Sequence, residues 1–344
     1  MARSQFTLVY LILALALGLG MPDKALADLI VLAAPRTGDQ YYKKQADQIF
    51  EFHVAFARQI DGDDDVLVLT DKGAYQRYVN ALGKSKVAIA PMSDIWLRDF
   101  SPSNAISPVM FRYTAEGQGG GKRGQVDADA VQGGLTRVLA KASLEFSKSD
   151  LLNDGGNFVD DYAGNVVISR KFLRDNKLTE DVARKKLIAY PGIDQVAFIE
   201  ADEQGGLEHA DGVVSFVATN SLMINSYPDD PEYERSLKAD LMRGLPGVKI
   251  HEIVTPYDGS KVIDPRFGSA CGLYTNALVT GTRIYFPQFG IPEDKVALAQ
   301  VRAMTKRKVV PVNSQQVCNM GGGVRCMSWQ LRGENAVRFL ALFQ

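Results

Sequence analysis

The sequence predicts an α/β fold, because short strand-like segments alternate with helical patterns along most of its 344 residues. The strand-like segments are short apolar runs rich in Val, Ile and Leu, which is typical of buried strands. In the helical segments the apolar residues recur every three or four positions, which indicates helices that cover a sheet with one face. We find no low-complexity linker and no sequence repeat, so we expect a single domain over residues 28–344.

The first strand is predicted at residues 29–33, and the helix after it at 40–60 has four apolar residues on one face (Ile49, Phe52, Phe56 and Ile60). Further strands are predicted at 66–69, 87–90, 166–168, 195–199, 212–218, 221–225, 277–279 and 283–286. Further helices are predicted at 74–82, 179–187, 294–305 and 334–343. The glycine-rich stretch 117–124 (GQGGGKRG) is too short for a domain linker and predicts a mobile surface loop.

Residues 1–27 have the features of a signal peptide. Arg3 gives a positive start, an apolar run follows from 6 to 20, and Ala25 and Ala27 are small residues at the positions that a signal peptidase reads. The apolar run is shorter than the roughly 20 residues that a membrane-spanning helix needs. We therefore expect cleavage after Ala27 and a periplasmic or extracellular location; the alternative is an uncleaved N-terminal anchor.

The charge and the cysteine count narrow the class of protein. A net charge of −1 gives no general attraction for nucleic acid or membrane surfaces. The chain has three cysteines, and an odd number in an exported protein suggests one pair and one free thiol. If Cys326 is kept reduced for chemistry, Cys271 and Cys318 are the possible partners, but they could equally be two unpaired core thiols.

Two short segments place charged or polar residues next to turns. In residues 94–102 (DIWLRDFSP) two acids and Arg98 follow an apolar strand, and such charges are costly to bury unless they are paired. We expect Arg98 to form an ion pair with one of the two aspartates, which leaves the other carboxylate available. Residues 153–157 (NDGGN) would by themselves indicate only a turn.

A third segment, 208–212 (EHADG), precedes a predicted strand. On an extended backbone His209 and Asp211 point to the same face, so they can act on one ligand. A His-x-Asp pair also occurs in metal sites, but the other two histidines, His53 and His251, do not complete a metal-ligand spacing. We therefore expect no metal.

The fourth segment, 321–328 (GGGVRCMS), carries Cys326. A lone cysteine is most often a buried structural residue. The three glycines before it favour another interpretation, because glycine lets the backbone approach a ligand closely. A thiol in such a loop, with a histidine and several carboxylates elsewhere in the chain, is the pattern of a cysteine nucleophile.

These side chains together suit a guanidinium substrate. Carboxylates bind a guanidinium through charge-assisted hydrogen bonds in one plane, so several carboxylates in one pocket imply a cationic ligand. A thiolate can add to the central guanidinium carbon, and a histidine can protonate the leaving amine and then activate water. That reaction is a deimination, and it needs neither a metal nor an organic cofactor.

Five motifs of the chain resemble those of the agmatine deiminase and bacterial peptidylarginine deiminase family, within the guanidino-group-modifying superfamily. They occur in the family's order: DIWLRDFSP (94–102), NDGGN (153–157), EHADG (208–212), YTNALVTGTRIYFPQFG (274–290) and GGGVRCMS (321–328). The resemblance implies a five-bladed α/β propeller of ββαβ units, with the active site in its central channel.

The resemblance also implies a role for each matching residue. Cys326 is similar to the nucleophile and His209 to the general acid and base, while Asp154 would orient His209 or touch the substrate. The remaining matches concern substrate binding. Two carboxylates would grip the guanidinium, one aromatic ring would flank the aliphatic stem, and one amide would lie near the nucleophile (Asp99, Asp211, Trp96 and Asn276).

Two positions depart from the family pattern. Asp154 stands where the family usually has Glu, and is one methylene shorter. Arg325 replaces the His that usually precedes the nucleophile in agmatine deiminases, which makes agmatine specificity less expected.

We therefore expect hydrolysis of a guanidinium group, with arginine in peptides or an arginine derivative ahead of agmatine, which would give N-carbamoylputrescine. Amidinotransfer is a further alternative, because the same thiol and imidazole would serve it. A non-catalytic binding protein is the last alternative, and the thiol argues against it because a binder has no need of one.

Overall fold

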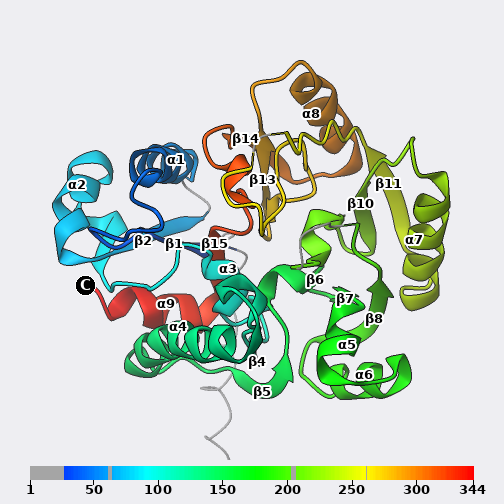
Figure 1. Cartoon of the computed structure of the whole chain (residues 1–344), viewed down its shortest axis with the longest axis horizontal. Helices are drawn as coiled ribbons and strands as arrows, with labels where there is room; N and C mark the ends of the chain where they lie inside the picture. The colour runs from blue at the N-terminus through cyan, green and yellow to red at the C-terminus, as the bar shows by residue number, and fades with distance from the viewer. Residues whose placement is uncertain (1–26, 61–63, 203–206, 261) are drawn as a thin grey trace, which may run out of the picture.

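The computed structural model describes residues 27–60, 64–202, 207–260 and 262–344. The signal-peptide interpretation of residues 1–27 thus falls almost entirely outside the described residues. In Figure 1 five small sheets surround a common centre and most helices lie on the outside. No helix within the described ranges is long and apolar enough to cross a membrane.

Three of the sheets follow one plan, in which an antiparallel pair of strands is followed by a helical crossover to a parallel third strand. The first consists of β6 (Val159–Asp160), β7 (Gly164–Ser169), α5 (Lys171–Asn176), α6 (Glu180–Leu187) and β8 (Ile193–Ile199). The second consists of β9 (Val214–Ala218), β10 (Ser221–Asn225), α7 (Pro231–Gly244) and β11 (Lys249–Ile253). The third consists of β12 (Leu278–Val279), β13 (Arg283–Gln288), α8 (Glu293–Met304) and β14 (Lys308–Asn313).

The other two sheets are variants of this ββαβ plan. In one of them, β15 near the C-terminus pairs antiparallel with β1, the first strand of the described chain, and this pairing closes the ring. The members of this sheet and its helices are β15 (Ser328–Arg332), β1 (Asp28–Ala33), α1 (Ala46–Gln59), β2 (Asp65–Thr70), α2 (Lys72–Leu82) and β3 (Val87–Ile89). In the other, an isolated bridge from Ser103 to Val109 replaces the inner strand; its members are β4 (Val109–Arg112), α4 (Gly121–Lys141) and β5 (Ser147–Leu152). The last helix is α9 (Gly333–Ala341).

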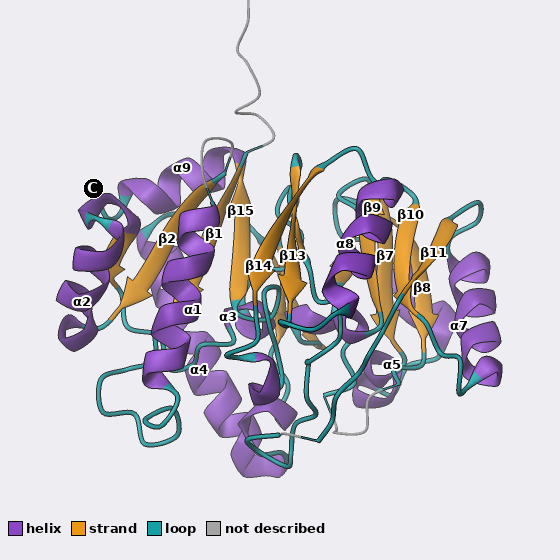
Figure 2. Cartoon of the chain, turned by 90° about the horizontal axis from the view of Figure 1, so that it is seen from above, coloured by secondary structure: helices purple, strands orange, loops and turns teal. Residues whose placement is uncertain are grey.

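The outer helices bury one face against the sheets. Helix α1 packs Ile49, Phe52 and Phe56 into a cluster that also contains residues of β2 and β14, so it covers the seam between two neighbouring sheets. Apolar burial of this kind contributes about 25 cal/mol per Å² and is the main force that holds the ring together. The expected α/β class and the five-bladed arrangement are confirmed. Figure 2 shows long loops gathered at one end of the strands.

One sequence interpretation needs correction. The stretch 117–124 was expected to be a mobile loop, but its second half is the first turn of α4. Gly119, Gly120 and Gly121 have positive φ angles and make the turn into the helix. Gly124 is buried, and a Cβ there would lie 2.8 Å from the carbonyl oxygen of Ala115, so the glycine permits close packing. Helix α1 also begins at Ala46, after turns that replace the expected helix over 40–45.

A disulfide joins Cys271 and Cys318, and Cys326 is left as a buried free thiol. Of the two arrangements that the sequence left open, the structure therefore has the paired one. The disulfide connects the loop before Asn276 to the short helix η6 (Cys318–Met320), which leads into the loop of Cys326. It thus links the two segments that meet at the thiol.

Loss of the disulfide should destabilise the fold. The bond connects residues 47 positions apart, and closing a loop of that size constrains the unfolded chain by about 2–5 kcal/mol. We expect the Cys271→Ser/Cys318→Ser variant to unfold at a lower urea concentration than the parent. Reductant should lower the parent's midpoint and leave that of the variant unchanged; equal midpoints without reductant would contradict the prediction.

Candidate active site

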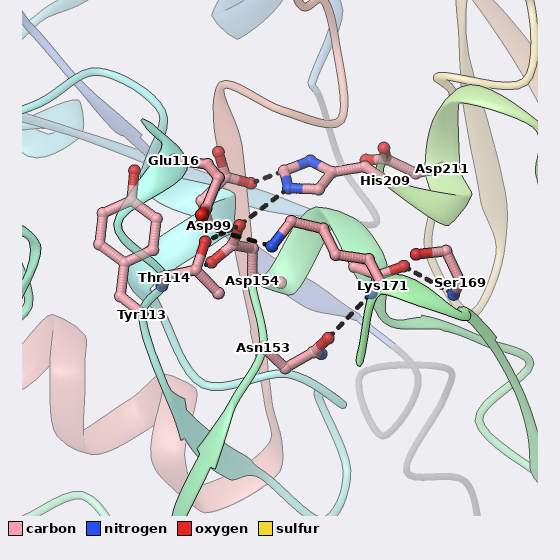
Figure 3. Close-up of polar contacts among 12 residues, drawn as sticks. Asp99, Tyr113, Thr114, Glu116, Asn153, Asp154, Ser169, Lys171, His209 and Asp211 are labelled. Atoms are coloured by element: carbon pink, nitrogen blue, oxygen red, sulfur yellow. Dashed lines mark hydrogen bonds and ion pairs between the residues drawn. The ribbon is translucent and has the colours of Figure 1, made fainter. Parts of the chain in front are cut away.

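Four segments from different parts of the ring bring their polar residues to its centre. Asp99 lies in α3 (Leu97–Phe100), Asp154 directly precedes η4 (Gly155–Asn157), His209 and Asp211 are at η5 (Ala210–Gly212), and Cys326 lies just before β15. All five side chains are buried. Figure 3 shows His209 turned toward Asp99 and Asp154.

His209 lies between two carboxylates. Its Nε2 is 3.0 Å from Oδ2 of Asp154, and its Nδ1 is 3.8 Å from Oδ1 of Asp99. Asp154 is fixed in turn by Thr114, whose backbone N–H and side-chain hydroxyl each donate to it at 2.8 Å. The residue before the histidine, Glu208, has a φ of 49°, in the left-handed region, and this turn aims His209 at the centre.

The charges and hydrogen bonds around His209, Asp99 and Asp154 decide the protonation states of these three side chains. Burial by itself would lower the pKa of His209, but Asp99 and Asp154 outweigh it and raise this pKa to about 10. Burial raises the pKa of Asp99 to about 7. For Asp154 burial also opposes ionisation, yet the hydrogen bonds from His209 and Thr114 prevail and its pKa is lowered. At neutral pH His209 is therefore an imidazolium, which is the form that can protonate a leaving amine.

The thiol of Cys326 is surrounded by an amide and carboxylates. Nδ2 of Asn276 donates to its Sγ at 3.0 Å, and Oδ2 of Asp211 lies 3.7 Å from the same sulfur. Burial raises the pKa of Cys326 well above its ordinary value, and the charges of Asp211 and Asp99 add to this effect. Two routes to a thiolate are open in principle, a nearby imidazolium or an arriving cation. This environment favours the arriving cation, because the carboxylates oppose a thiolate until a positive ligand lies between them.

Two buried oxygen atoms at this place have no hydrogen-bond partner among the described residues. They are Oδ1 of Asp99 and Oδ1 of Asn276. A buried acceptor without a donor is unfavourable by about 1–3 kcal/mol, so such atoms mark a place for a ligand with N–H groups. A planar guanidinium presents five N–H donors and one positive charge, which is what these acceptors and carboxylates lack.

Asp211 is already bound by a guanidinium of the chain itself. Nη1 of Arg325 lies 2.7 Å from Oδ2 of Asp211, and Nη2 of Arg325 donates to the carbonyl of Phe158 at 2.6 Å. Arg325 thus connects the loop that carries Cys326 (residues 321–327, called the thiol loop) to the segment after Asp154. It binds Oδ2 of Asp211 and leaves the other carboxylate oxygen for a substrate. The sequence singled out Arg325 only as a departure from a motif, and nothing in the sequence indicated this contact.

The expected ion pair of Arg98 is absent from the described structure. Arg98 instead donates to Oε1 of Gln330 at 3.1 Å and to the carbonyl of Arg325 at 3.5 Å. Burial and the neighbouring Arg325 lower the pKa of Arg98 to about 10. The prediction was wrong because the backbone turn of α3 separates Arg98 from Asp99 and directs them to different neighbours.

The glycines of the motifs make room for these side chains. A Cβ on Gly322 would lie 2.4 Å from the ring of Trp96, and one on Gly156 would lie 2.3 Å from Nδ1 of His209. The half-buried Trp96 therefore packs onto the loop of Cys326, and its contact with a substrate stays a prediction. The two contacts explain why short glycine runs lie beside Trp96 and His209.

The structure brings together Cys326, His209, Asp99, Asp154 and Asp211, as the sequence predicted, with Asn276 and Trp96 beside them. Thr114 was missed, because a threonine outside any motif carries no signal of its contact with Asp154. The described residues contain no group of three or more His, Cys, Asp or Glu side chains that could hold a metal ion.

Comparison with known proteins agrees with this geometry. The model of the Porphyromonas-type peptidyl-arginine deiminase family matches residues 21–331. The chain belongs to this family. The resemblance found in the five motifs is therefore confirmed, and membership of the peptidyl-arginine deiminase family makes the chain a cysteine-dependent hydrolase of C–N bonds in guanidino compounds.

Relatives and solved structures extend the comparison. An agmatine deiminase of Pseudomonas fluorescens is 23% identical over 319 residues, which cover 81% of this chain and 86% of the relative. The structure of an agmatine deiminase of Enterococcus faecalis superposes with a TM-score of 0.70 at 21% identity, over 91% of this chain and 95% of the other. A substrate-bound agmatine deiminase of C. jejuni gives a TM-score of 0.72 at 15% identity, over 91% and 96%. Structural matches at such identities establish the shared fold.

Replacement of the thiol should abolish turnover. We expect Cys326→Ala to lose activity with an unchanged unfolding midpoint, because the change removes the nucleophilic sulfur but only one heavy atom, whose side-chain contacts among the described residues are with Asn276 and Asp211. A haloacetamidine should add mass at Cys326 in the parent and nowhere in the variant. Full activity in Cys326→Ala would remove the thiol from the mechanism.

We expect kcat/KM to fall at both the acidic and the alkaline end of the pH range. Below about pH 7 Asp99 takes up a proton and loses its attraction for a guanidinium, so kcat/KM should fall as the pH falls through this value. Above about pH 10 His209 loses the proton that it gives to the leaving amine, so kcat/KM should fall again. His209→Ala should lose turnover, and a covalent adduct at Cys326 can accumulate in it. A flat profile from pH 5 to 10 would contradict these assignments.

The contact of Arg325 with Asp211 should show as non-additive stability. Arg325→Ala leaves a buried carboxylate without its cation, which is unfavourable by about 3–5 kcal/mol. We expect the double variant Arg325→Ala/Asp211→Asn to recover part of that loss, measured by urea unfolding. Strictly additive losses would mean that Arg325 acts mainly through the carbonyl of Phe158 and not through Asp211.

Proposed function

We propose that the protein converts the guanidinium of arginine, in a peptide or in an arginine derivative, into a ureido group with release of ammonia. The observation that supports this most is the buried thiol of Cys326, which lies beside carboxylates and two oxygen atoms, on Asp99 and Asn276, that accept no hydrogen bond from the described residues. A planar cation would complete this arrangement, and its central carbon would then face the sulfur.

The reaction begins when the guanidinium binds to Asp99 and Asp211. Its charge offsets the effect of the carboxylates on Cys326, the thiol proton passes to solvent, and the thiolate adds to the guanidinium carbon. His209 then donates its proton to one nitrogen, and ammonia leaves with the electron pair of the broken C–N bond. The remaining covalent intermediate is a thiouronium.

The second half of the reaction uses the same groups. His209, now neutral, takes a proton from a water molecule, and the hydroxide adds to the thiouronium carbon. Collapse of this adduct breaks the C–S bond with the electron pair going to sulfur, the hydroxyl proton passes to the departing sulfur, and the thiol of Cys326 and a ureido group result. Asp154 holds His209 in one orientation throughout, since their hydrogen bond is 3.0 Å long and Thr114 fixes the carboxylate.

The charges beside the site support arginine over agmatine. Agmatine carries a second cation, the ammonium at its far end, which needs a free acceptor. The acidic residue Glu116 lies near this group in Figure 3, but Lys171 is paired with it at 3.4 Å. Lys171 is itself buried and also contacts Asp175. Agmatine remains the second candidate substrate, because curated relatives are named agmatine deiminases. With agmatine as its substrate, the enzyme would have a role in putrescine biosynthesis.

We further propose that residues 1–27 are a signal peptide and that the enzyme acts outside the cytoplasm. The disulfide between Cys271 and Cys318 supports this proposal, because such bonds persist in oxidising compartments. An exported enzyme meets peptides and free arginine compounds, which fits the proposed substrate.

A substrate panel tests the proposal. The panel contains a peptide with internal arginine, a peptide ending in arginine, an N-acylated arginine, free arginine and agmatine, and both ureido product and ammonia are measured. We expect the highest kcat/KM for one of the arginine compounds, and none for any substrate with Cys326→Ala. Turnover of agmatine alone would make the protein an agmatine deiminase. Guanidino transfer to an added amine, without ammonia release, would indicate an amidinotransferase.

A further inference from the structure

A buried carboxylate that is not one of the catalytic residues lies directly before β2. Asp64 is 4% exposed, and its oxygen atoms accept three hydrogen bonds. The donors are the backbone nitrogen of Asp28 at 2.9 Å, the hydroxyl of Thr280 at 3.0 Å and the hydroxyl of Tyr285 at 2.9 Å. All three donors are neutral in the unprocessed chain. Within the described ranges no Lys, Arg or His side chain forms an ion pair with Asp64, although a buried carboxylate is stable only when its charge is compensated.

The nitrogen that reaches Asp64 belongs to a particular residue. Asp28 directly follows Ala25-Leu26-Ala27, the segment in which small residues occupy the positions read by a signal peptidase. Hydrolysis of the peptide bond between Ala27 and Asp28 consumes one water molecule. It gives Ala27 a carboxylate and Asp28 a free amine, which is protonated near neutral pH.

We propose that Asp64 is a binding site for the α-ammonium group of residue 28, so that removal of the leader supplies the cation that this buried carboxylate lacks. The inference rests on the proposed export of the chain. It needs no rearrangement, because the same nitrogen already lies 2.9 Å from Oδ1 of Asp64. A charged ammonium also has more N–H donors than an amide, and hydrogen bonds between charged groups are about twice as strong as neutral ones.

The position of this site explains what processing would change. The side chain of Asp28 receives two hydrogen bonds from Arg332, at 2.5 and 3.0 Å, and one from Gln330 at 3.0 Å. Both residues are on β15, the strand that pairs with β1 to close the ring and that begins two residues after Cys326. The new amino terminus would therefore stabilise the ring closure beside the thiol loop. A precursor without this ion pair is less stable, which suits a chain that must cross a membrane before it folds.

The test compares two forms of the chain that differ only at the amino terminus. The first starts at Asp28 and is released from a ubiquitin-like fusion by a protease that leaves no extra residue. The second carries Gly-Ser-Ala before Asp28, so that its nitrogen is an amide. We expect the chain that starts at Asp28 to have the higher Tm, by roughly 5 °C, as for a buried ion pair in a protein of this size. Asp64→Asn should lower the Tm of that chain and have a smaller effect on the extended one.

Thr280→Val is the matched control. It removes another donor to Asp64 but leaves the amino terminus unchanged, so it should lower the Tm of both chains by the same amount. If Asp64→Asn does not fold, amine acetylation decides: the α-amine of the Asp28 chain should resist acetylation in the folded state and react after unfolding. Equal effects of Asp64→Asn on both chains, or ready acetylation of the folded chain, would overturn the proposal. So would an exported protein whose amino terminus, determined by sequencing, is not Asp28.

Discussion

Buried negative charge is the constraint on which the catalytic centre depends. Asp99, Asp154 and Asp211 meet around one thiol, and carboxylates in a protein interior must be compensated by cations or donors. The chain supplies part of that compensation with His209 and Arg325. A guanidinium would supply the remaining positive charge and N–H donors, so the buried carboxylates themselves indicate the kind of ligand that fits this site.

The hydrogen-bond donors around each carboxylate also give Asp154 and Asp99 different properties. Asp154 is fixed by Thr114 and the imidazole of His209, and these hydrogen bonds lower its pKa and keep it ionised. Asp99 has an oxygen atom without a hydrogen-bond partner in the described structure, and its pKa is raised by burial, so its ionised form depends on a positive neighbour. Two aspartates of one site thus have opposite pKa shifts because their donors differ.

The ring geometry makes this convergence possible. Short segments at the ends of strands in different units carry the side chains of the site, at α3, before η4, at η5 and before β15. The pairing of β15 with β1 closes the ring directly beside the loop of Cys326. Stability of the closure and geometry of the thiol are therefore linked, and the disulfide joins a second segment to the same loop.

The sequence by itself determined the α/β class, most strands, and the chemistry, because apolar periodicity and reactive residues beside glycines are local signals. Those residues also carried the family resemblance, and with it the propeller. Only the tertiary structure decided the partner of each side chain. Arg325 binding Asp211, Arg98 turning to Gln330 and Thr114 fixing Asp154 all depend on segments far apart in the chain. A sequence lists charges in order, but their compensation depends on distances that exist only after the five units have closed into a ring.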